Sequence, residues 1–167
     1  MFNIGDRIVY GSEGVFCVSE YTSSPLDKTD ERVFYVLRPI YLSENNLIVT
    51  PSEGGVTVMR PVMSREEAFA LIERIPEIGE VTVENERGRK DAYRTVLSRC
   101  RGEDFVSIIK TVRRRRRDFL AQKRRMSETD TDFEDRAKKC LVSELAVALD
   151  LSREEAEVIL SGKIIAE

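Results

Sequence analysis

The stretch Val-Met-Arg-Pro-Val-Met-Ser-Arg-Glu-Glu, residues 58–67, marks a change of period in the chain. Before Pro61, β-branched and aromatic residues gather in short runs separated by turn residues, which is typical of strands. After it, apolar residues recur at the spacing of helices. Ser64 and Glu67 form a capping box, because the serine hydroxyl can accept from the amide of Glu67 while the glutamate reaches back. The sequence therefore predicts a β module followed by a helical module.

The first sixty residues predict about five short strands, at 7–10, 14–18, 32–37, 46–50 and 56–59. The turn signals between them, such as the segment from Gly11 to Gly14, are spaced as in a small antiparallel barrel. Barrels of this size commonly serve as binding modules, although the architecture alone does not define a function.

The rest of the chain predicts an all-α bundle. Apolar stripes place helices within 64–75, 92–100, 105–120, 131–149 and 152–160, the fourth beginning near a capping box at Thr131 and the fifth after Ser152. Pro76 ends the first helix, and a polar link follows it. We therefore expect an α+β fold with a β-barrel at 1–62, a linker helix at 63–76 and a helical domain at 77–167.

Composition argues against an enzyme. The chain has no histidine, which removes the commonest general base and the commonest zinc ligand. Its three cysteines lack metal-ligand spacing, and Cys100 and Cys140 fall on apolar stripes, so we expect reduced core thiols. No nucleophile elbow or phosphate-binding glycine loop is present. We predict no catalytic residue, metal or cofactor, and without a long apolar segment or a leader pattern we expect a cytoplasmic protein.

Charge is segregated along the chain. Five consecutive arginines occupy 113–117, and residues 87–125 carry 15 Lys and Arg against 4 Asp and Glu, whereas the other 128 residues carry 12 against 26. This basic region predicts an anionic partner. Successive helical residues are about 100° apart, so the five arginines cannot share one face, and Arg116 lies nearly on the apolar stripe. Part of the run must therefore be structural, and a solvated arginine-rich face is the alternative explanation.

A second basic group precedes the first bundle helix and consists of Arg87, Arg89, Lys90 and Arg94. Phosphates near a helix N-terminus gain from free backbone amides, and an arginine on a loop can enter a narrow minor groove. Neither Asn nor Gln lies beside these residues on the predicted helix to read a base edge, so we expect contact without sequence specificity.

Several motifs, in order, resemble the CarD-like family of bacterial transcription regulators over nearly the whole chain. They are residues 1–10, 31–37, 46–51 with 58–64, 89–94, 104–112 and 137–145. No single one is diagnostic, but their order and spacing together are fairly specific.

The resemblance implies a monomeric, non-enzymatic adaptor associated with the nucleoid through RNA polymerase. A Tudor-like barrel would dock on the lobe of the polymerase β subunit, and the helical domain would contact promoter DNA at the upstream edge of the melted bubble, changing the stability of the open complex. The polymerase-binding strand would be Leu47, Ile48, Val49, Thr50 and Pro51, pairing by β-augmentation. Phosphate and minor-groove contacts would come from Arg87, Arg89, Lys90, Arg94, Arg113, Arg114 and Arg117.

Two departures limit what the resemblance implies. The first turn carries Gly11 to Gly14 where the family often has Pro and His, which alters the turn. Many members also insert a tryptophan wedge before the first bundle helix, and residues 82–89 contain no aromatic residue. Arginine supplies mainly charge, so we expect weaker or differently placed stabilisation of melted DNA. A basic module that binds RNA, an anionic membrane or an acidic protein surface is the alternative.

Overall fold

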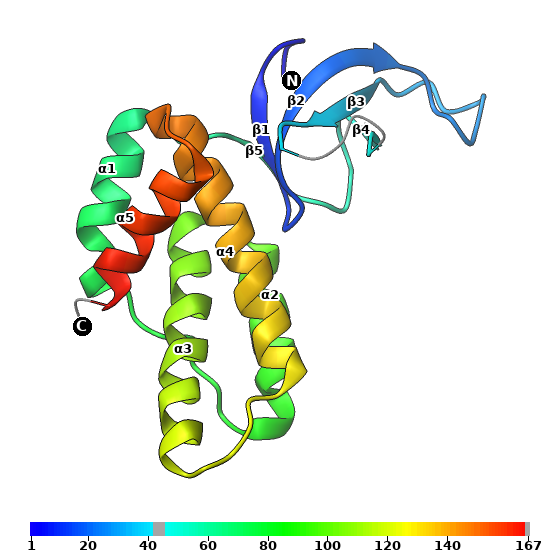
Figure 1. The fold of residues 1–167 in the computed structure, drawn as a ribbon. Coiled ribbons are helices and arrows are strands. Elements are labelled where there is room, and N and C mark those ends of the chain that lie inside the picture. Colours follow the sequence, from blue (N-terminus) through cyan, green and yellow to red (C-terminus); the bar gives the residue numbers. More distant parts are fainter. Residues whose placement is uncertain (42–45, 166–167) are drawn as a thin grey trace.

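The computed structural model describes residues 1–41 and 46–165. Within these residues, an antiparallel sheet of five strands precedes five α-helices, which confirms the α+β prediction (Figure 1). The strands are β1 (Arg7–Tyr10), β2 (Gly14–Thr22), β3 (Phe34–Pro39), β4 (Ile48–Pro51) and β5 (Met59–Pro61). The helices are α1 (Arg65–Arg74), α2 (Arg89–Ser98), α3 (Gly102–Ala121), α4 (Glu128–Leu149) and α5 (Arg153–Ile165), with 3-10 turns η1 (Ile75–Glu77) and η2 (Glu86–Gly88).

The sheet is open. Its strand order is β4-β3-β2-β1-β5, and among the described residues the two edge strands do not pair with each other. A register shift between Val18 and Glu20 marks a bulge in β2, which bends that strand. The antiparallel β module is therefore confirmed, whereas the expected closure into a barrel is not seen.

The predicted helix starts are correct where a capping box is present. Ser64 Oγ accepts from the Glu67 amide at 3.1 Å, and Glu67 accepts from the Ser64 amide at 2.7 Å. Ser152 and Glu155 repeat this arrangement before α5. The predicted box at Thr131 is wrong, because α4 begins earlier, at Glu128, with Ser127 as its N-cap.

One continuous apolar core joins the sheet to the bundle. Val9 and Val15 project from β1 and β2 into the same cluster as the buried residues of all five helices. A smaller cluster fills the other face of the sheet, with Ile8 and Phe16 pointing the opposite way from their neighbours, as the period of a strand requires. Helix α1 contributes Leu71 to the main core, so the expected linker helix packs as part of the helical body.

The turn between β1 and β2 is held on the bundle by polar contacts. The Cys100 thiol donates to the Gly11 carbonyl and the Cys140 thiol to the Ser12 carbonyl, each at 3.2 Å. Arg136 Nη2 donates to Ser12 Oγ at 2.6 Å. Burial raises the pKa of the Cys140 thiol to about 12, so at neutral pH it keeps the proton that it donates. Both cysteines are buried and free, as the sequence predicts.

A buried ion pair fixes β5 against α4. Glu144, in the middle of α4, is fully buried, and the Arg60 guanidinium grips its carboxylate with two nitrogens, Nη2 lying 2.7 Å from Oε2. The Met63 amide donates to the same carboxylate at 3.0 Å. The remaining Arg60 nitrogen, Nε, donates to the Cys100 carbonyl. Arg60 thus connects the sheet, α4 and the junction between α2 and α3.

We expect Arg60→Met to lower the free energy of unfolding by about 3–5 kcal/mol, because it leaves the Glu144 carboxylate buried without its cation. Chemical denaturation of the full chain measures this loss. Arg38→Met is the matched control, since Arg38 is exposed on strand β3 of the same sheet, and it should stay within about 0.5 kcal/mol of the wild type. Equal stability of the two variants would show that the ion pair contributes nothing.

Candidate nucleic-acid interface

Exposed cations gather at the end of the bundle far from the sheet. The start of α2, the end of α3 and the start of α4 meet there, at the lower end of Figure 1. We call this surface the basic tip and define it by six exposed residues: Arg87, Lys90, Arg117, Lys123, Arg124 and Arg125. Glu84, Asp118 and Glu128 are exposed at the same end, so the surface has mixed charge with an excess of cations.

Local structure shapes the basic tip. Helix α3 ends with Lys123 in the left-handed region, at φ 54°, and the Arg124 amide donates to the Phe119 carbonyl at 2.8 Å, as in a Schellman motif. The guanidinium groups of Arg115 and Arg124 both lie over the Phe119 ring, at 5.1 and 4.9 Å from its centroid. On the facing segment, the Asn85 side chain caps η2 by accepting from the Gly88 amide. The cations therefore project from ordered turns and from the adjoining ends of α2 and α3.

Most of the arginine run is used inside the protein. Arg114 pairs with Glu80 at 2.9 Å, and Arg115 makes two hydrogen bonds to Glu86, at 2.8 and 3.0 Å. Arg113 and Arg116 both pair with Glu134, a buried acid of α4. Arg117 is exposed and forms no ion pair within residues 1–41 and 46–165. The five arginines spread around α3, as helical geometry requires, and four of them connect it to neighbouring segments.

Asp130 is the buried centre of this network. Its carboxylate accepts from Ser127 Oγ at 2.8 Å and from Arg89 Nε at 2.9 Å, and Arg115 Nε lies 3.6 Å away. The Tyr93 hydroxyl is buried beside it, and burial together with the Asp130 charge raises the pKa of Tyr93. Arg89, predicted to face DNA, has a side chain only 13% exposed. Its position therefore shows a structural role in holding α2 against α4.

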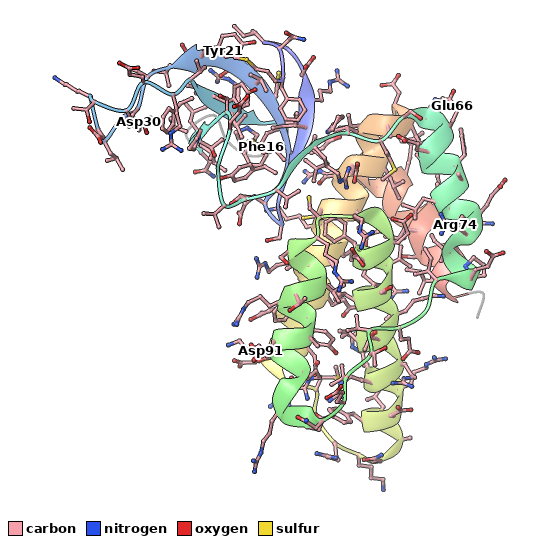
Figure 2. The ribbon with its side chains drawn as sticks, turned by 180° about the vertical axis from the view of Figure 1, so that it is seen from behind. Phe16, Tyr21, Asp30, Glu66, Arg74 and Asp91 are labelled. Carbon is pink, nitrogen blue, oxygen red and sulfur yellow. The ribbon has the colours of Figure 1, made fainter. Side chains whose placement is uncertain are left out.

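The other predicted DNA-binding residues divide into two groups. Arg87, Lys90 and Arg117 lie on the basic tip. Arg94 is exposed on α2 but pairs at 3.0 Å with Asp91, which Figure 2 shows pointing away from the bundle. Arg113 pairs with Glu134 and its side chain is 25% exposed, whereas Arg114 pairs with Glu80 and remains 55% exposed. The sequence assignment missed Lys123, Arg124 and Arg125, although three consecutive cations directly after the last apolar residues of a helix are a recognisable signal of an exposed basic loop.

The predicted polymerase-binding segment lies at a sheet edge. Strand β4 pairs on one side with β3, Val49 opposite Val36. The Ser52 amide donates to the Val33 carbonyl, and since hydrogen-bonded pairs alternate along an antiparallel ladder, the amide and carbonyl of Val49 point away from β3. The side chains of Leu47 and Val49 are 46% and 41% exposed. The edge thus offers both backbone hydrogen-bonding groups and apolar contact.

Neither protein-family models nor curated proteins match the chain. In residues 1–41 and 46–165, no three His, Cys, Asp or Glu side chains are grouped so that they could hold a metal ion. The helices of that part of the chain are too short or too polar to cross a membrane.

We expect Arg89→Met to lower the free energy of unfolding by about 3 kcal/mol, because Asp130 is fully buried and loses its closest cation. Thermal or denaturant unfolding of the full chain measures this change. The neighbouring substitution Arg87→Met removes an exposed cation of the basic tip and should change stability by less than about 0.5 kcal/mol. A stable Arg89→Met protein would contradict the structural role of this arginine.

Proposed function

We propose that the chain is a non-catalytic transcription regulator that docks on the β subunit of RNA polymerase through the β4 edge and contacts promoter DNA through the basic tip. Its curved sheet would serve as the Tudor-like module of the CarD-like family. The observation that carries the proposal is the placement of two different contact surfaces, the β4 edge of the sheet and the basic tip of the bundle, at opposite ends of the molecule (Figure 1).

The β4 edge supports the docking half of the proposal. A partner strand could pair with the backbone of Leu47 and Val49 and cover their exposed side chains, which is how β-augmentation combines affinity with specificity. The opposite edge strand, β5, is unsuited to this role, because Arg60 ties it to the bundle. Of the two edges, β4 is the one that faces away from the helices in Figure 1.

The basic tip supports the DNA half. Its cations are arginines and lysines on turns and at helix ends, which suit phosphate contact, and their excess over the acids favours an interaction that weakens strongly with salt. Gln122 is the amide side chain nearest in sequence to the Lys123 to Arg125 group, and it accepts from Arg124 at 3.4 Å. The proposed contact is therefore with the phosphate backbone, without reading of the base sequence.

The structure gives less support to the membrane alternative. An amphipathic helix that lies on a membrane needs a free apolar face. Of the apolar stripe predicted for α3, Phe105, Ile108, Ile109 and Val112 are completely buried in the core, whereas Leu120 at its end is exposed. The arginines beside it are mostly paired with acids of the same chain. RNA shares the phosphate chemistry of DNA, so it is an outcome to be distinguished by experiment.

The docking half is tested by retention of the full chain on immobilised polymerase core and on the isolated β lobe. The full chain is required because Val9 and Val15 of the sheet share the core of the bundle. We expect Val49→Asp to weaken binding at least about tenfold, since it places a charge at the centre of the paired edge. Val158→Asp, at an exposed position of α5, is the control and should bind normally. If Val49→Asp binds the polymerase as tightly as the Val158→Asp control, the β4 edge is not the docking surface.

The DNA half is tested with a short duplex at several salt concentrations. We expect Lys90→Glu combined with Arg125→Glu to weaken binding about tenfold at low salt and to reduce the slope of log affinity against log salt by about 2. Lys28→Glu combined with Arg38→Glu makes the same change of net charge at exposed positions of the sheet module, away from the basic tip. An equal loss in both proteins would reject the basic tip as the contact, and tighter binding of RNA than of the duplex would favour the RNA alternative.

A further inference from the structure

Two guanidinium groups pair with one exposed carboxylate at the basic tip, and the charge of a third acts on it. Glu86, in η2, accepts two hydrogen bonds from Arg115 and also pairs with Arg89. The Arg115 hydrogen bond, followed by the charges of Arg115, Arg89 and Arg124, lowers the pKa of Glu86. These four residues come from η2, α2, α3 and the loop that precedes α4. The carboxylate is therefore the anionic member of a cluster assembled from four segments.

We propose that this cluster is a phosphate-binding site that Glu86 occupies in the free protein and that a phosphate of duplex DNA takes over on binding. The inference rests on the proposed contact between the basic tip and DNA and deepens it by naming the site. Glu86 would compete with the DNA phosphate for these arginines, so that the protein binds DNA less tightly than it would without this carboxylate. The carboxylate stands in for the phosphate because both present two oxygens to a planar guanidinium.

The exposure of the partners fits an exchange of this kind. The Glu86 side chain is 68% exposed, whereas those of Arg115 and Arg89 are 14% and 13% exposed. The carboxylate thus covers the arginines from the solvent side and can leave by a rotation of its own side chain. The backbone of η2 need not move, because its capping bond is made by Asn85. Departure of Glu86 uncovers the two terminal nitrogens of Arg115.

The balance of charge gives the uncovered site its affinity for an anion. Without Glu86, the charge of Asp130 faces both Arg89 and Arg115, and Arg115 Nε, although buried, makes no hydrogen bond to it. One positive charge is then left without a counter-ion, and Arg124 adds a second nearby. A phosphate oxygen pair restores the two hydrogen bonds that Arg115 made to Glu86 and releases counter-ions from the DNA.

The test compares Glu86→Gln with Glu84→Gln in the full chain. Glu84 is exposed two residues away, so its substitution makes the same change of net charge next to the site. We expect Glu86→Gln to tighten binding of a short DNA duplex about fivefold at low salt, and to steepen the slope of log affinity against log salt by about 0.9, one additional phosphate contact. Glu84→Gln should tighten binding by less than about twofold, through long-range charge alone.

Two further measurements identify the site. Adding Arg115→Lys to Glu86→Gln should abolish the gain, because lysine keeps the charge but cannot make the forked contact. Titration with inorganic phosphate should shift the NMR signal of the Arg115 Nε–H group in Glu86→Gln at lower phosphate concentrations than in the wild type. An equal response of the two proteins to phosphate, or an equal gain in DNA affinity from Glu84→Gln, would overturn the inference.

The same data separate this inference from the proposed function. If charge reversal at Lys90 and Arg125 weakens DNA binding but Glu86→Gln does not strengthen it, the DNA contact stands and the phosphate site fails. If the variants and the wild type do not bind DNA, but inorganic phosphate shifts the Arg115 signal preferentially in Glu86→Gln, the site exists and the proposed contact with DNA fails.

Discussion

The carboxylate of Glu144, fully buried in the middle of α4, is stable as an anion only where a cation and further donors reach it. Its cation is Arg60 of β5, more than eighty residues earlier, so the sheet must pack against the bundle for the bundle itself to be stable. The thiol contacts of Cys100 and Cys140 with the first turn reinforce this attachment. The two modules that the sequence periods distinguish consequently share the main apolar core.

The requirement of a buried carboxylate for a cation also decides which arginines remain available to contact a partner molecule. Helix α4 carries two further buried acids, Asp130 and Glu134, and each takes up arginines from α2 or α3. A helix with five consecutive arginines must direct them to several sides. Those that face α4 and the preceding link become parts of the fold, and the cations that stay exposed come mainly from the ends of the helices. Formal charge along the sequence therefore exaggerates the basic surface.

The sequence predicts the features that depend on neighbouring residues. The α+β order, the capping boxes at Ser64 and Ser152 and the apolar stripe of α3 all follow from local spacing, and the structure confirms them. The features that the sequence could not predict depend on contacts between residues far apart in the chain. The difference between buried Arg89 and exposed Arg87 is set by Asp130, about forty residues later. An acidic residue on an otherwise apolar helix face was the available signal, but it does not say which arginine it meets.

Helix α4 also sets the distance between the sheet and the basic tip. With 22 residues it is about 33 Å long, close to the rise of ten base pairs of DNA, and it runs from the basic tip to the region that holds the sheet. Because one core joins its two ends, a partner held at the β4 edge and a duplex held at the tip would have a fixed separation and a fixed rotational phase. Inserting a single residue into α4 would turn one surface by about 100° relative to the other.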